Sequence, residues 1–167
     1  IFYIICNLTT NNEEDEINLF CIQNNFIDIF FQEYNSILSS PIDLNQFEAI
    51  SLVFPVLSGL IKFLIFPNLI ANETFIQLLT IITDILRRRN QLVFCGERVK
   101  MILKSILSVI GKIDLTILIE TEFIFQVYDI LNEDPHISSH FKHAFFLLGY
   151  IAFVETPISN EIITKLN

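Results

Sequence analysis

The expected fold is decided by the stretch Ile1–Asn35, which reads IFYIICNLTTNNEEDEINLFCIQNNFIDIFFQEYN. An apolar run opens this stretch, and a polar, acidic segment follows it at Asn12–Asp15. Apolar side chains then recur at helical spacing from Ile17, and a second apolar group at Phe26–Phe31 ends at Asn35-Ser36. The pattern predicts the end of one helix followed by two short helices, the first of which starts at the acidic segment.

Patterns of the same kind continue along the rest of the chain. A long helix is predicted from Asp43 or Asn45, either of which can cap it, to about Lys62, and Pro67-Asn68 breaks it. Further helices are predicted over about residues 72–89, 96–110, 115–121, 122–131 and 136–154, and from residue 158. Helices of short, medium and long length thus follow one another twice, at a spacing of about 40 to 50 residues that is typical of an α-solenoid.

The composition agrees with an all-α chain and disfavours several classes of function. Hydrophobic residues make up 52% of the 167 residues, whereas 4 Gly and 5 Pro are too few for a many-turned sandwich or barrel. The net charge of −9 repels phosphate backbones, so we expect no nucleic-acid partner, and it attracts basic peptides. The 3 cysteines have no close spacing and predict no disulfide framework.

Related short sequences occur where long helices are predicted to end. They are Asn7-Leu8, Leu57-Ser58-Gly59-Leu60, Ser108-Val109-Ile110 and Leu148-Gly149-Tyr150-Ile151. Together with the helix order, these stretches resemble the junctions of armadillo repeats, which carry Asn-Leu or Asn-Ile at the end of the third helix. The resemblance implies a right-handed α-solenoid of armadillo (ARM/HEAT-like) repeats. Residues 1–167 would form a single domain of about three to four repeats cut from a longer array.

Within this family the chain resembles importin-α. The break at Lys62–Asn68 falls where importin-α proteins carry a basic, proline-containing loop. Importin-α binds nuclear localisation signals between Trp and Asn side chains four residues apart, which share one helix face. The Asn amide binds the peptide backbone, and the rings take Lys and Arg stems. The matching pairs are Tyr3 with Asn7 and Phe146 with Tyr150, so the resemblance assigns these residues to peptide binding.

The resemblance also implies a function. It predicts a protein-binding adaptor that recognises basic or extended peptide segments for nuclear protein import, in the cytoplasm and nucleus, and that contacts importin-β through a region preceding Ile1. The equivalent pairs Pro55 with Gly59 and Ser105 with Val109 lack both the ring and the amide. A general armadillo or HEAT scaffold unrelated to import is therefore an alternative.

An acidic run precedes the first short helix. Glu13, Glu14, Asp15 and Glu16 are expected to steer a basic partner toward the chain. The alternative is a solvated helix N-terminus, where the helix dipole favours acidic side chains. Both interpretations place the run on the surface.

Three histidines could share one face of the predicted helix 136–154. His136, His140 and His143 are spaced by four and three residues, which is compatible with binding of Zn²⁺. No cysteine is near them in sequence, so we expect an amphipathic helix start and no metal or other cofactor.

Motifs of catalysis are missing from the sequence. It contains no Gly-rich phosphate loop, no GxSxG and no HExxH, so we expect no enzymatic activity and assign no catalytic residue. A membrane-associated helical protein is a further alternative, based on the apolar windows Ala49–Phe66 and Ala144–Val154. Polar interruptions in the first window and the shortness of the second argue against it, since a bilayer needs about 20 apolar residues. We therefore expect no membrane partner.

Overall fold

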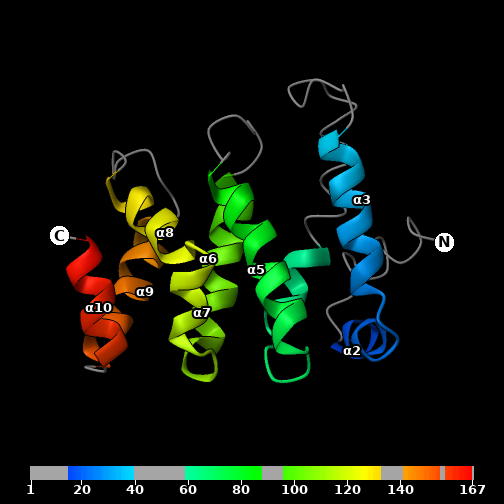
Figure 1. Ribbon diagram of the computed structural model, residues 1–167, viewed down its shortest axis with the longest axis horizontal. Helices are drawn as coiled ribbons and strands as arrows, with labels where there is room; N and C mark the ends of the chain where they lie inside the picture. The colour runs from blue at the N-terminus through cyan, green and yellow to red at the C-terminus, as the bar shows by residue number, and fades with distance from the viewer. Residues whose placement is uncertain (1–14, 40–58, 88–95, 133–140, 155–156, 167) are drawn as a thin grey trace.

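The computed structural model describes residues 15–39, 59–87, 96–132, 141–154 and 157–166, and all regular structure in these ranges is helical. Residues 59–63 form helical turns that end at Phe63. The remaining elements are α2 (Asp15–Gln23), α3 (Ile27–Ser39), α5 (Asn72–Arg87), α6 (Gly96–Val109), the 3₁₀ helix η1 (Ile110–Lys112), α7 (Leu115–Glu120), α8 (Phe123–Asn132), α9 (Phe141–Phe153) and α10 (Pro157–Leu166) (Figure 1). The predicted all-α class is confirmed for the described residues.

The helices pack in two layers (Figure 1). In this view α3, α5 and α8 lie in front, and α6 and α9 lie behind α5 and α8. α5 packs against α8 within the front layer, α6 packs against α9 within the rear layer, and α8 contacts α9 across the layers. α10 packs on α7, α8 and α9. The pair α5–α6 therefore lies directly beside the pair α8–α9.

A cluster of buried apolar side chains holds the layers together. On α5 the spacing of three and four residues brings Phe75, Leu78 and Ile82 to one side, where each is at most 2% exposed. Phe30 of α3 is fully buried and packs edge-on against Phe63, with ring centroids 5.3 Å apart. Burial of such a side chain contributes about 1.5–3 kcal/mol, so the packing of these faces outweighs weak local preferences.

Gly59 is needed for this packing. A Cβ atom built on Gly59 would overlap the ring of Phe30, which is itself fully buried. The residue that stands at a predicted repeat junction is therefore a point of close contact between α3 and the helical turns 59–63. A larger residue here would overpack the core.

The turn between α2 and α3 stops the first helix at a defined residue. Asn25 has a left-handed backbone (φ 55°), which Asn tolerates better than most residues. The amide of Phe26 donates to the carbonyl of Cys21 at 2.8 Å, and the amide of Asn25 donates to that of Ile22 at 3.1 Å. The rings of Phe20 and Phe26 lie 5.9 Å apart. Together these contacts form a Schellman motif, which explains why the two helices are separate.

One predicted boundary was wrong. α3 does not end at Asn35-Ser36 but continues to Ser39. Tyr34 is buried and its hydroxyl donates to the carboxylate of Asp84 on α5 at 3.2 Å, so tertiary packing overrides the weak stop signal. Gly111 lies within η1, and no described glycine has a positive φ.

The lengths of the helices bear on the alternative of a membrane-associated protein. None of the helices in the described ranges combines the length and the apolar character that a bilayer span requires. The apolar window Ala144–Val154 lies mostly on α9, and most of the window Ala49–Phe66 lies outside the described residues. α9 carries exposed apolar side chains on its surface.

Candidate protein-binding surface

The exposed side of α9 is aromatic. Phe146, Tyr150 and Phe153 are 50%, 37% and 83% exposed. They follow one another at intervals of four and three residues, so they lie on one side of the helix. Clustered exposed apolar side chains on a protein surface mark sites of interaction, whereas single ones do not. This side of α9 is therefore the leading candidate for a binding site.

The opposite side of α9 is core. Ala144 and Leu147 are fully buried, and Ile151 is 1% exposed. These residues hold the helix against its neighbours α6 and α8. α9 is thus apolar on both sides, although helices of this kind are normally covered all round. The exposed rings are positioned by a rigid core and leave a large apolar area in contact with water.

Two neighbours fix the ring of Phe146. The ammonium group of Lys142 lies 5.8 Å from the ring centroid, which is the geometry of a cation–π contact. The ring of Phe145 meets it edge-on at 6.2 Å, with an interplanar angle of 67°. These two contacts favour one orientation of the exposed Phe146 ring.

α6 extends this surface with polar side chains. Lys104 and Ser108 are exposed and lie one turn apart, and Lys112 follows a turn later in η1. Ile102 and Ile106, on the other side of α6, are fully buried. We call the combined surface of Lys104, Ser108, Lys112, Lys142, Phe146, Tyr150 and Phe153 the aromatic–lysine face.

A pocket with a volume of about 300 Å³ lies where the C-terminal ends of α6 and α9 meet. A Cβ atom on Gly111 would lie 3.1 Å from the hydroxyl oxygen of Tyr150, so Tyr150 reaches across to η1. The volume exceeds that of a cavity of roughly 150 Å³ that binds benzene, so the pocket can accept an apolar side chain. Its lining consists of Ile110, Gly111, Ile113, Asp114, Leu115, Tyr150 and Val154.

Asp114 is the carboxylate at the edge of this pocket. Its side chain caps α7 by accepting a hydrogen bond from the amide of Thr116 at 3.0 Å. This backbone hydrogen bond, together with one from the Thr116 side chain, lowers the pKa of Asp114. The carboxylate is thus engaged with its own helix.

The described acidic side chains lie outside the rear layer. Apart from Glu97 and Arg98, whose side chains are not described, the charged residues of α6 and α9 are Lys100, Lys104 and Lys142. The described acidic side chains belong to the other helices and to their connections. They are Glu16, Asp28, Glu33, Glu73, Asp84, Asp114, Glu120, Glu122, Asp129 and Glu161.

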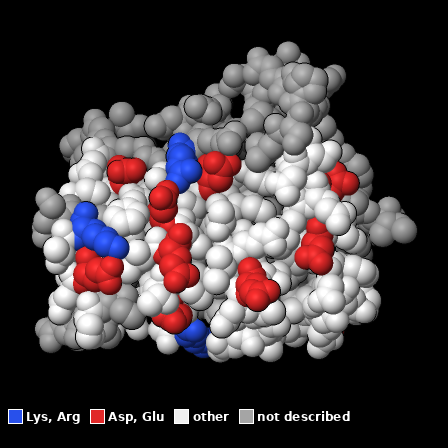
Figure 2. All heavy atoms as spheres, viewed as in Figure 1, with Lys and Arg blue, Asp and Glu red and all other residues white. Residues whose placement is uncertain are grey.

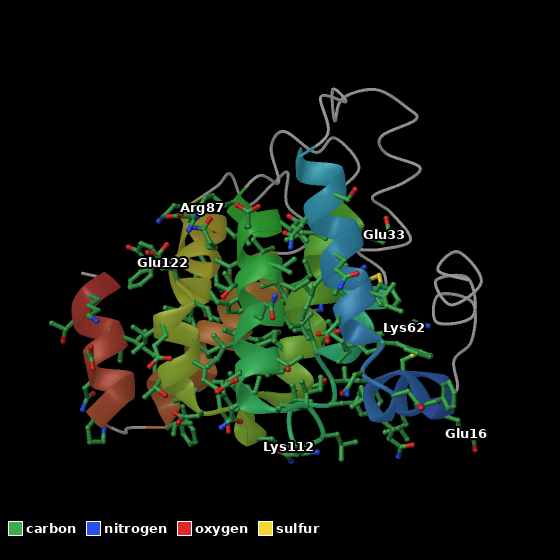
Figure 3. All side chains as sticks on the ribbon, turned by 45° about the vertical axis from the view of Figure 1, so that its right-hand side comes forward. Glu16, Glu33, Lys62, Arg87, Lys112 and Glu122 are labelled. Carbon is green, nitrogen blue, oxygen red and sulfur yellow. The ribbon has the colours of Figure 1, made fainter. Side chains whose placement is uncertain are left out.

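Figure 2 shows the charged side chains on the face formed by α3, α5, α7, α8 and α10, where acidic side chains clearly predominate over basic ones. We call it the acidic face. On it Arg87 lies 2.7 Å from Glu122, and Figure 3 places both at the end of the molecule opposite Lys112. The pair borders a second pocket of about 370 Å³, lined by Thr80, Thr83, Asp84, Arg87, Glu120, Thr121 and Glu122.

The residues predicted to bind peptide fall into two groups. Phe146 and Tyr150 lie together on the exposed side of α9, whereas Tyr3 and Asn7 lie outside the described residues. Of the other junction positions, Gly59 is buried and Val109 is 6% exposed. Only the pair on α9 is thus accessible among the described junctions.

The acidic run and the histidines are described in part. Glu13 and Glu14 lie outside the described residues, Asp15 is the first residue of α2, and Glu16 is exposed. His136 and His140 also lie outside, and His143 is partly buried on α9. Within the described part of the chain, no group of three or more His, Cys, Asp and Glu side chains could hold a metal ion.

Sequence reasoning assigned Phe146 and Tyr150 to a binding site and missed the other five residues of the aromatic–lysine face. Lys142, Phe146, Tyr150 and Phe153 follow a helical spacing of four, four and three residues that was visible in the sequence. The pocket and the contribution of α6 carry no such signal, because they depend on how two helices pack.

Comparison of the chain with protein-family models, with curated proteins and with solved structures gives no match in any of the three.

Proposed function

We propose that this chain is a protein-binding adaptor of the armadillo type, which holds an extended segment of another protein on the aromatic–lysine face. The observation that carries this proposal is the exposed row of Phe146, Tyr150 and Phe153 on a helix whose other side is fixed in the core. Aromatic side chains are enriched among the residues that dominate binding energy in protein interfaces.

The arrangement of helices supports an armadillo-like solenoid as part of the proposal. α5 packs on α8 and α6 packs on α9, so helices of equivalent order lie side by side. The C-terminal ends of α6 and α9 meet at one pocket. Helices packed about 10 Å apart can be crossed by about three residues of extended chain, at about 3.3 Å per residue.

The import role implied by importin-α stays a prediction. It requires Lys- and Arg-rich segments to bind along the third helices, which correspond to α6 and α9. The lysines on these helices would repel such a ligand, whereas the acidic side chains lie on the other face. This distribution favours the alternative of an armadillo scaffold that binds a different class of protein segment.

The proposal can be tested with a random peptide library displayed on phage and selected against the full chain. Enriched peptides are synthesised, labelled and titrated by fluorescence anisotropy. We expect the double substitution F146S/Y150S to weaken their binding at least about tenfold, since truncation of a central aromatic anchor costs about 2 kcal/mol or more.

The matched control is F20S. Phe20 is 56% exposed on α2 and also meets a neighbouring ring edge-on, but it lies outside the proposed site. Its substitution should leave affinity within about twofold, and circular dichroism melts should show that both variants fold. Failure to enrich any peptide, or an equal loss with F20S, would overturn the proposed function.

A further inference from the structure

We propose that the aromatic–lysine face selects acidic segments of other proteins, with one apolar side chain inserted in the pocket beside Tyr150. The inference rests on the proposed protein-binding function and names the chemistry of the partner. It is the opposite of what the net charge of −9 suggests.

Among the described side chains, lysines outnumber carboxylates on this face. Lys104, Lys112 and Lys142 are exposed on it. Asp114, which lines the pocket, keeps its negative charge, since the hydrogen bond from the amide of Thr116 lowers its pKa. Most of the described carboxylates belong to other helices, and exposed charges more than about 8 Å apart are largely screened at physiological ionic strength. Along the described parts of α6 and α9, a bound ligand therefore meets lysines and no carboxylate.

The pocket supplies the apolar part of the recognition. Ile110, Ile113 and Leu115 line one side of it, and Tyr150 and Val154 line the other. A Leu, Met or Phe side chain that enters would remove both its own surface and these linings from water. Phe146 and Phe153 flank Tyr150 along α9 and would cover the adjoining part of the segment.

The geometry sets the spacing that a ligand needs. Lys142 and Tyr150 are separated by eight residues of α9, which corresponds to about 12 Å along the helix axis. An extended chain covers that distance in about four residues. The preferred ligand is thus an apolar anchor with an Asp or Glu about four residues away, near Lys142. A second carboxylate close to the anchor would meet Lys112.

The experiment analyses the composition of peptides selected by the full chain from the random library. We expect enriched peptides to be more acidic than the unselected library and to share one large apolar residue. The variant K104E/K142E should bind them at least about tenfold more weakly. Selection on that variant should remove the acidic bias, because the attractive charges have become repulsive.

The matched control is K165E. Lys165 is about half exposed on α10, where it lies 2.7 Å from Glu161, and it is outside the aromatic–lysine face. Its reversal changes the net charge in the same direction and should leave affinity within about twofold. A loss with K165E equal to half of that seen with K104E/K142E would show a general charge effect and overturn the inference.

The failure of this inference differs from failure of the proposed function. If the selected peptides are neutral or basic but bind more weakly to F146S/Y150S, the acidic selectivity is disproved and the proposed adaptor function stands. Peptides insensitive to F146S/Y150S would remove both. Sedimentation could instead show that the chain is a dimer and that K104E/K142E dissociates it. The aromatic–lysine face would then bind the acidic face of a second copy, and the inference would be overturned.

Discussion

The acidic face and the aromatic–lysine face are built from the same kind of helix but differ in what they leave exposed. On α5 the exposed positions are polar, as at Gln77 and Thr80, and the apolar residues point inward. On α9 the exposed positions include Phe146, Tyr150 and Phe153. The acidic face is an ordinary solvated surface, whereas the aromatic–lysine face is costly to leave in water. This difference is the basis of the proposal that a partner binds the aromatic–lysine face.

The largest effect is expected when the two sides of α9 are compared directly. L147A removes a fully buried side chain and should lower the free energy of unfolding by about 2–5 kcal/mol. F146A, at the neighbouring and half-exposed position, should lower it by less than about 1 kcal/mol. Urea unfolding followed by circular dichroism measures both. Equal losses would mean that the aromatic side is core and not a binding surface.

A smaller effect is expected at Asp114, where the two faces meet at the start of α7. D114A removes the N-cap and should cost about 1 kcal/mol at neutral pH. The pKa of Asp114 is lowered in the folded protein, so its charged form contributes stability above the unfolded pKa of about 3.9. That contribution is lost as the pH falls through the lowered pKa.

Thermal unfolding between pH 7 and pH 2 checks this prediction. D114N keeps an oxygen acceptor for the amide of Thr116 but cannot titrate. The gap in stability between the wild-type chain and D114N should therefore narrow as the pH falls below about 4. A gap that is constant with pH would contradict the assigned role of the charge.

The smallest effect is expected on the acidic face itself. R87A breaks the 2.7 Å ion pair with Glu122, in which both side chains are more than half exposed. Exposed pairs contribute about 0.2–1 kcal/mol, so the loss of stability should lie in that range and shrink in high salt. Affinity for peptides that bind the aromatic–lysine face should not change, and a measurable change would show that the two faces are coupled.

Helix positions could be predicted from the sequence because helical periodicity is a local property. The segments that became α5, α7 and α8 were predicted to within about two residues, a normal uncertainty for helix ends. The end of α3 was not, because burial of Tyr34 against α5 extends the helix past Asn35 and Ser36. Contacts between residues 50 positions apart leave no periodic signal in the chain.

The candidate site could be predicted in part for the same reason. The pair Phe146 and Tyr150 was assigned by its spacing on one helix, and both side chains are exposed. The pair Ser105 and Val109 has the same spacing, yet Val109 is buried. Spacing shows which residues share a helix side, but only the neighbouring helices determine which side is covered.

The sequence by itself determined that the described chain is helical, roughly where its helices lie, and that α9 is apolar almost throughout. These properties follow from spacing, propensity and breakers within single segments. Only the tertiary structure decided that Leu147 faces the core while Phe146 faces water, and that the described carboxylates lie outside the layer of α6 and α9. It also decided that Gly111 leaves room for Tyr150 at the pocket. Each of these depends on which helices pack together, and a net charge of −9 contains no information about that.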